Sequence, residues 1–274
     1  MLADLSRASA HARWEMAAAV GAPFVPTTDI SGITAISAIL DVATATLVSG
    51  DISSLPDLLN SNPAVQTVSG RRPTLELSAG NGLPCMRFAT NDALSWPITA
   101  QSAGGTSQAG WGLWVKLDAA SGVQSLIRVS SNTGGANGGR IALSSTSAAA
   151  FMTAFDSSGT SSDNKTTGNV LNTGWHFLTC EYDSTAGTDA TKMTVTVDGG
   201  SLGTVSGSAT LSTLFAATGN IVIGNRQDAS SGAFPLNGLI GPNIYAFGSK
   251  TAGATTGLLS SNERTSLMNY RRPT

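Results

Sequence analysis

From Ile36 onward, short apolar segments alternate with polar, turn-forming ones. The apolar segments are rich in Val, Ile, Phe, Thr and Trp, and clusters of Gly, Ser, Asn and Asp separate them. This rhythm is typical of a sandwich of antiparallel strands. It predicts strands near 36–42, 84–89, 111–117, 123–130, 139–145, 150–156, 175–183, 192–198, 220–225 and 237–248.

Alternation is clearest in the segment 192–198, where Met193, Val195 and Val197 share one face of the predicted strand. The Asp198-Gly199-Gly200 run that follows favours a tight turn and a hairpin return. Stretches rich in Gly, Ser, Thr and Asn have little apolar surface to bury and are predicted to be loops. These stretches are 102–110, 131–139 and 157–169.

The first 30 residues differ from the rest of the chain. Residues 1–20 are Ala-rich and predict a short helix that ends at Gly21, and Pro23 then keeps the chain extended. We interpret residues 1–30 as an arm that packs on its own domain or on a neighbouring subunit. Its candidate assembly residues are Leu2, Leu5, Trp14 and Met16.

Two further helices are predicted. Ser260 and Glu263 have the spacing of a capping box, which would place Leu267 and Tyr270 of a final helix against the sandwich. A second helix is predicted at 53–60, where Pro56 would lie in the first turn.

Three passages resemble the concanavalin A-like (laminin-G-like) jelly-roll family, of the kind found in phage virion and bacterial surface proteins. The passages are 72–75 (RPTL) with 81–88 (NGLPCMRF), 174–183 (GWHFLTCEYD) with 195–199 (VTVDG), and 221–226 (IVIGNR) with 234–240 (FPLNGLI). Their order is that of the family. The resemblance implies an all-β, two-sheet antiparallel jelly roll over residues 31–274.

The resemblance does not specify a function, because this fold carries lectins, glycosidases, adhesion modules and virion components. Several residues of the matching passages have a structural role by their chemistry alone. Trp175 is a large ring at a strand start, where it can seal one end of the core. Gly224 and Gly238 fall where a strand must bend or another backbone must approach closely.

Composition excludes two classes of partner. Of the 274 residues, 41% are hydrophobic and 12% are charged, and the formal net charge is −2. Nucleic-acid binding needs clustered Lys and Arg, which the chain lacks. No segment approaches the roughly 18 apolar residues of a membrane span, and the first residues do not have the pattern of a signal peptide.

Catalytic patterns are incomplete. Glycosidases of this fold carry two or three carboxylates at alternate positions of one strand. The chain offers Glu181-Tyr182-Asp183, but Thr185 and Ala186 stand where a third carboxylate would be. Its two histidines, His11 and His176, are far apart in sequence. We therefore predict that the protein is not an enzyme.

Cofactor and thiol chemistry are not indicated. No metal site is predicted, although calcium stays an alternative because Asp198, Asn225 and Asp228 lie in loops that could approach one another. Cys85 and Cys180 have no metal or redox spacing, and two buried free thiols are favoured over a disulfide.

A binding surface is suggested by strand alternation. Trp111, Leu113 and Val115 share one face of the strand 111–117, which leaves Trp114 on the opposite face. There its ring could stack on a sugar or a partner, unless the arm or another loop covers it. Arg128 and Arg140 also lie opposite apolar neighbours and could line the same sheet.

These observations favour a non-catalytic structural or interaction protein of a phage-like virion. It would be a head decoration, fibre or tail-associated protein that contacts other virion proteins or copies of itself. The alternative is a lectin-like carbohydrate-binding module of a cell-surface or secreted protein, with host-surface glycans as partners.

Overall fold

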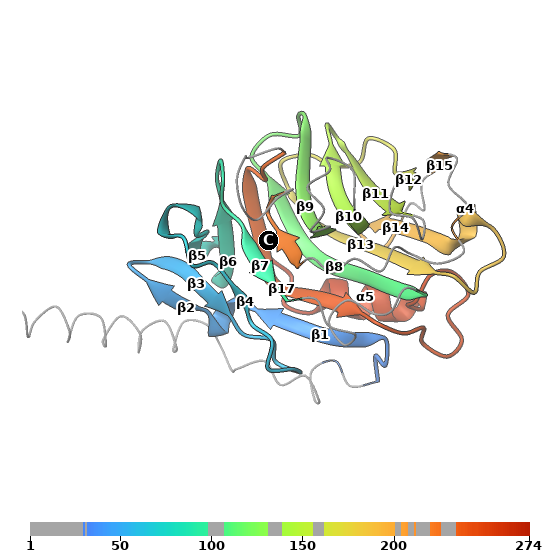
Figure 1. Ribbon diagram of the computed structural model, residues 1–274, viewed down its shortest axis with the longest axis horizontal. Coiled ribbons are helices and arrows are strands. Elements are labelled where there is room, and N and C mark those ends of the chain that lie inside the picture. The colour runs from blue at the N-terminus through green and yellow to red at the C-terminus, as the bar shows by residue number, and fades with distance from the viewer. Residues whose placement is uncertain are drawn as a thin grey trace, which may run out of the picture.

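Figure 1 shows a computed structural model of the chain. The structure describes residues 30, 32–97, 107–130, 139–155, 162–200, 204–207, 211, 220–225 and 234–274. The predicted arm, with Leu2, Leu5, Trp14 and Met16, therefore lies outside the described residues.

The regular secondary structure of the described residues is almost entirely β-strand. Its strands are β1 (Ile36–Asp41), β2 (Thr46–Val48), β3 (Asp51–Leu55), β4 (Ala64–Val65), β5 (Thr74–Gly80), β6 (Leu83–Phe88), β7 (Leu94–Trp96), β8 (Gln108–Leu117), β9 (Val123–Ser130), β10 (Gly139–Thr146), β11 (Ala149–Phe155), β12 (Ser162–Thr166), β13 (Trp175–Asp183), β14 (Met193–Val197), β15 (Thr204–Gly207), β16 (Ile221–Ile223) and β17 (Gly238–Phe247). The helical elements are η1 (Val42–Thr44), η2 (Ser69–Arg71), α4 (Asp189–Lys192) and α5 (Ser261–Asn269).

The strands form two antiparallel layers. One layer, the first sheet, has the order β1–β17–β8–β13–β14. The other, the second sheet, has the order β7–β16–β9–β10–β11–β12–β15. Strands β2 to β6 join the layers at one end, because β6 pairs with the first residues of β17 and β4 pairs with β7. Figure 1 shows β2–β6 gathered at the left of this sandwich. The predicted all-β jelly-roll fold is confirmed.

Alternation along the strands places one face of each sheet in the main core. Trp111, Leu113 and Val115 of β8 face inward and meet residues of the second sheet such as Met152 and Leu143, all at most 1% exposed. Burial of these side chains is the main favourable term for folding.

A second apolar cluster lies on the outer face of the first sheet. It joins Trp114, Phe177, Tyr245 and Phe247 to Leu258, Leu259 and Leu267 of the C-terminal segment, which we define as residues 248–274. Helix α5 therefore covers this sheet from outside. Its capping box is present as predicted, with the Ser260 hydroxyl accepting from Glu263 N–H and Glu263 accepting from Ser260 N–H. Leu267 is fully buried and Tyr270 packs at the edge of the cluster.

All ten predicted strands are present, with shifts at their ends. The helix predicted at 53–60 is wrong. Its first residues belong to β3, because Leu55 and Ser54 pair with β4 and bury Leu55. Asp57 then closes a turn by accepting from the N–H groups of Leu59 and Asn60. Strand pairing here outweighs a weak local helix preference.

Part of the predicted loop 157–169 is also wrong, because residues 162–166 form β12. That strand is too polar to be recognised by its apolar pattern. The tight turn at Asp198-Gly199 is confirmed, with mutual hydrogen bonds between Val197 and Gly200. The predicted hairpin return is wrong, because β15, the strand that follows, pairs with β12 and not with β14.

Several local expectations are confirmed. Both cysteines are free and buried. A Cβ atom at Gly224 would fall on the ring of Phe88, and one at Gly238 would fall on the carbonyl oxygen of Lys116, so both glycines permit close approach. Among the described residues, no helix combines the length and the apolar character needed to cross a membrane.

Candidate ligand-binding faces

Trp114 lies on the outer face of the first sheet, as the alternation of β8 predicts. The ring is not open to solvent, however, because the side chain is only 2% exposed. Phe177 packs beside it with ring centroids 5.4 Å apart, and the Arg272 guanidinium lies 5.8 Å from its ring centroid. The prediction that Trp114 presents a stacking surface is therefore wrong for this arrangement. The alternative of a covering segment holds, and the cover is the C-terminal segment.

Glu181 anchors that segment to the sheet. Its carboxylate is fully buried and forms a two-pronged ion pair with Arg264, at 2.8 Å to Nε and 2.7 Å to Nη2. It also accepts from the N–H groups of Leu258 and Leu259 and from the Thr179 hydroxyl. With every oxygen engaged and no access to solvent, this carboxylate serves as a structural anchor.

Two more ion pairs hold the same segment. Asp183 accepts from Lys250 at 2.8 Å, and Asp41 accepts from Arg271 at 3.0 Å through both oxygens. Burial opposes ionisation of Asp183, but hydrogen bonds from Lys250, Thr185 and Gln108 outweigh it and hold its pKa below the ordinary value. At Asp41 burial prevails over Arg271, and the pKa of that carboxyl is raised.

His176 has an acidic partner that sequence distance concealed. Its Nδ1 lies 2.7 Å from Asp198 Oδ2, and its Nε2 accepts from Asn172 N–H at 3.3 Å. Asp198 also accepts from Phe177 N–H. Burial raises the pKa of Asp198, but the His176 and Phe177 hydrogen bonds outweigh it and lower that pKa. Nδ1 thus fastens the turn after β14 to β13, and Nε2 binds the loop that leads into β13.

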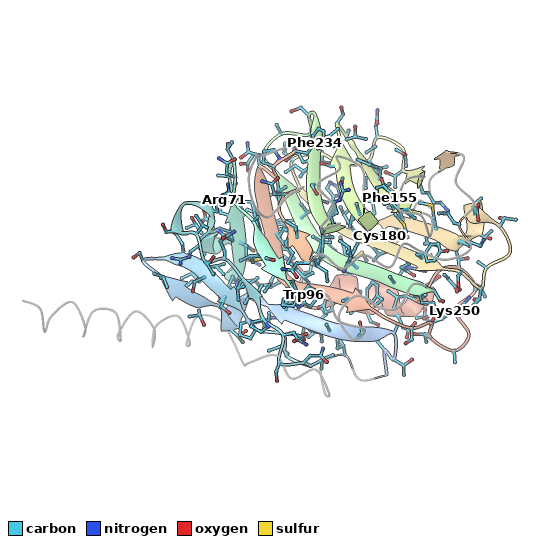
Figure 2. The ribbon with its side chains drawn as sticks, in the orientation of Figure 1. Arg71, Trp96, Phe155, Cys180, Phe234 and Lys250 are labelled. Carbon is cyan, nitrogen blue, oxygen red and sulfur yellow. The ribbon has the colours of Figure 1, made fainter. Side chains whose placement is uncertain are left out.

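Arg128 lies on the outer face of the second sheet. Its neighbours Ile127 and Val129 point into the core, so its own side chain points outward. The guanidinium lies over the ring of Phe155, 5.6 Å from the centroid. This distance is typical of a cation–π contact. Figure 2 shows Phe155 over β10 and β11, away from Lys250 and the C-terminal segment.

The strands beside Arg128 bring polar side chains into line with it. Arg128 pairs with Ala142, which pairs with Thr153 of β11. One step along the same outward face, Ser144 pairs with Phe151, which pairs with Thr166. We call this surface the Arg128 face and define it by Arg128, Ser144, Phe151, Thr153, Phe155 and Thr166. It combines a cation, two aromatic rings and three hydroxyls.

The two predicted arginines belong to neighbouring strands, because β9 pairs with β10 and Arg140 lies in β10. The Arg140 side chain is outside the described part. The expectation that these arginines share a sheet with Trp114 is wrong. Strand β8 belongs to the first sheet and β9 to the second, so Trp114 and Arg128 face opposite sides of the sandwich. Alternation within a strand cannot indicate to which sheet that strand belongs.

Sequence reasoning missed Phe151 and Phe155. A signal for them exists in the alternation of β11, where Ala150, Met152 and Ala154 are inward and Phe151, Thr153 and Phe155 are outward. In the described part of the chain, no three His, Cys, Asp or Glu side chains gather as a metal site would require. Asp228, one of the three predicted calcium candidates, lies outside that part.

No protein-family model matches the sequence, and a search of curated proteins finds no relative. Solved structures share the fold. A sialidase of Trypanosoma rangeli in complex with sialic acid matches with a TM-score of 0.55 and 12% identity, over 96% of this chain and 38% of the sialidase. The binding domain of botulinum neurotoxin serotype G matches with a TM-score of 0.50 and 13% identity, over 85% of this chain and 50% of that domain.

A smaller neighbour is the CBM40 of the Ruminococcus gnavus IT-sialidase, bound to α2,3-sialyllactose. It matches with a TM-score of 0.45 and 16% identity, over 60% of this chain and 83% of that one. At these identities the likeness concerns the β-sandwich fold alone. The chain spans half or less of the sialidase and neurotoxin chains.

Proposed function

We propose that this protein is a non-catalytic, lectin-like module that binds glycans on the Arg128 face. The observation that carries the proposal is the Arg128 guanidinium above the Phe155 ring, on a sheet face that also carries three hydroxyls and a second aromatic ring beside the apolar Ala142 and Val222. Such a face supplies both of the interactions that saccharides use.

A sugar presents an apolar ring face and a rim of hydroxyl groups. An aromatic ring can stack on the former, and hydrogen bonds from Arg, Ser and Thr can fix the latter. Phe151 is the partly exposed ring of this face, and Thr166 beside it is also partly exposed. Arg128 adds several donors in a fixed plane, which suits vicinal hydroxyls or a sugar carboxylate.

The comparisons agree with this proposal without carrying it. The same fold occurs in a sialidase solved with sialic acid and in the binding domain of a neurotoxin. The buried and fully engaged Glu181 supports a non-catalytic function, because it removes the most evident carboxylate from any reaction. The proposed location is extracellular or at a cell surface, where glycans are found.

A glycan array tests the proposal. The wild type should retain a defined set of glycans, and Arg128→Ala should weaken retention at least tenfold. Arg128→Lys should restore little of the glycan retention, because the lysine ammonium group lacks the planar set of hydrogen-bond donors that a guanidinium provides. Arg87→Ala is the matched control, since Arg87 is a partly exposed arginine on β6 that pairs with Asp118.

Two outcomes would contradict the proposal. One is a folded wild type that retains no glycan at any practical concentration. The other is Arg128→Ala binding the same glycans as strongly as Arg87→Ala does.

The virion role predicted from the sequence remains a prediction. The arm on which it depends lies outside the described residues. Deletion of residues 1–22 should abolish incorporation into a particle if that role is correct.

A further inference from the structure

Polar side chains form a row across the outer face of the first sheet, at the level of Trp114. Asp41 of β1 pairs with Asn243 of β17. Asn243 ends a bulge of β17 that lies against β8, and a Cβ atom at Gly241 in this bulge would come 2.5 Å from Trp114 Cβ. Tyr245, two residues further along β17, has the same orientation as Asn243. Neighbouring strands lie about 5 Å apart, so these side chains are within reach of one ligand.

Residues 271–274, which we call the tail, run over this row. Arg271 contacts Asp41, Arg272 lies over the ring of Trp114, and Pro273 reaches the β5–β6 hairpin, 3.2 Å from a Cβ position at Gly80. Arg271 directly follows the last residue capping α5 and has a φ of 46°. The left-handed region is unfavourable for an arginine, and this position after a helix is usually glycine. The tail is therefore held by contacts that offset a strained backbone.

The row beneath the tail is incompletely hydrogen-bonded. In the row, Trp114 Nε1, both polar atoms of the Asn243 amide and Tyr245 Oη are buried without a hydrogen-bond partner, and in the tail Arg271 Nη2 is too. Trp114, Asn243 and Tyr245 are each at most 2% exposed. Buried polar groups are almost always paired, and several unpaired groups in one place are unusual. The tail contacts this row at Asp41 and Trp114 and supplies none of the missing hydrogen bonds.

We propose that the row Asn243–Trp114–Tyr245 is a second ligand-binding site, for a saccharide or a similarly hydroxyl-rich ligand, and that the tail occupies it in this structure. With the tail displaced, the Trp114 ring provides a stacking face. The indole N–H donates, the Asn243 amide both donates and accepts, and the Tyr245 hydroxyl does either. Arg272 occupies the position over the ring that a sugar would take, and therefore acts as an internal competitor.

This site is independent of the Arg128 face, because Trp114 and Arg128 lie on opposite sides of the sandwich. It also differs from a purely structural cover. A structural cover should match the polar groups beneath it, as the Glu181–Arg264 pair and its backbone donors do. At the anchor both oxygens of Glu181 are paired and the Thr194 hydroxyl beside them is not, whereas four polar atoms of the row lack a partner, and this difference supports a role beyond packing.

The test removes the tail in a background where the other face is silent. Arg128→Ala is combined with deletion of residues 271–274, and separately with Arg272→Ala, which leaves the Asp41–Arg271 anchor in place. Each protein is first shown to be folded by its thermal transition and is then applied to a glycan array. Removal of the tail should increase retention of at least one glycan tenfold or more, and Arg272→Ala should give a smaller increase.

The gain must depend on the row. Trp114→Phe keeps an aromatic ring but removes the indole N–H, and should abolish most of the gain. Trp111→Phe is the matched control, because Trp111 Nε1 is also buried without a partner but its ring faces the core between the sheets. This control should leave the gain unchanged.

The results separate this proposal from the one for the Arg128 face. If no glycan is gained in any folded tail variant, or if Trp111→Phe removes the gain as Trp114→Phe does, the second site is overturned. Should the deletion fail to fold, the Arg272→Ala protein decides the matter, and no gain there also overturns the site. Whether Arg128→Ala loses the glycans that the wild type retains tests the proposal for the Arg128 face and has no bearing on the second site.

Discussion

The two outer faces of this sandwich are built from the same alternating strands but have different surroundings. The outer face of the first sheet carries Trp114, Phe177, Tyr245 and Phe247, and the C-terminal segment covers it. The outer face of the second sheet carries Phe151, Phe155 and Arg128 among hydroxyls. One face is closed by three ion pairs, whereas on the other Arg128, Phe151 and Thr166 are partly exposed and Ser144, Thr153 and Phe155 are buried.

The difference shows that an outward aromatic residue is not in itself a binding residue. Trp114 looks like the better stacking group in the sequence, because Trp rings are large and prominent at binding sites. In the folded chain it is the more buried of the candidates, because Glu181, Asp183 and Asp41 attach a covering segment above it. The carboxylates that resemble catalytic groups are the ones that close this face.

The largest effect should come from breaking the best anchor of the covered face. Glu181→Gln leaves the Arg264 guanidinium buried without its counter-ion, and should lower the free energy of unfolding by about 3–5 kcal/mol. Urea denaturation measures this loss. Glu76→Gln is the control, because Glu76 is partly exposed and lies 3.6 Å from Arg87, and it should cost less than about 1 kcal/mol. Equal effects would mean that Glu181 is not a structural anchor.

The next largest loss of stability should come from placing a side chain at Gly257, next to the Glu181–Arg264 ion pair. A Cβ atom at Gly257 would fall on Glu181 Oε2 and 2.8 Å from Arg264 Nη2, whereas nothing lies within 4 Å of one at Gly253. Both glycines have positive φ, 70° and 85°. An alanine would therefore strain the backbone at both positions, but only at Gly257 would it also overpack its surroundings. The free energy of unfolding of Gly257→Ala should be lower than that of Gly253→Ala by about 1–3 kcal/mol. If the two variants melt at the same temperature, the Glu181–Arg264 pair can shift without loss of stability, and the prediction is wrong.

The dependence on pH should be smaller and should involve Asp183. Its pKa in the folded state is lowered, so its contribution to stability is present above the unfolded pKa of about 3.9 and is lost as the pH falls through the folded value. Melting temperatures of the wild type should therefore fall more steeply below about pH 4 than those of Asp183→Asn. Parallel curves for the two proteins would contradict the assignment.

The contribution of Asp41 to stability should change with pH in the opposite direction. Its folded pKa is raised, so between the unfolded and the folded pKa the folded state binds more protons, and its effect favours folding as the pH falls. Asp41→Asn should remove this compensation. The fall of melting temperature with acid should accordingly begin at a higher pH in Asp41→Asn than in the wild type.

The smallest effect on stability should come from the open face. Arg128→Ala removes a cation–π contact at a partly exposed site, worth about 0.5–1 kcal/mol. The same variant should lose most glycan binding, so that stability and binding separate. A loss of stability as large as that of Glu181→Gln would identify Arg128 as a structural residue.

Much of the fold follows from local patterns in the sequence. The alternation of apolar residues in β8, β11, β13 and β14 predicts both the strands and the side chains that face inward. The Ser260 and Glu263 pair predicts the last helix, because a capping box depends on a few neighbouring residues. Short or polar strands such as β4 and β12 are missed, since their pairing partners and not their own side chains make them strands.

The candidate sites depend on contacts that are distant in the chain. Alternation alone places Trp114 and Arg128 outward, and it gives the face of Phe155 as well. Only the tertiary structure decides that Trp114 and Arg128 lie on opposite sides, because sheet membership is set by pairing between distant strands. Only the tertiary structure likewise brings Arg264, 83 residues from Glu181 in sequence, onto that carboxylate and the tail onto Trp114. Periodicity orients a side chain, and long-range packing determines what lies above it.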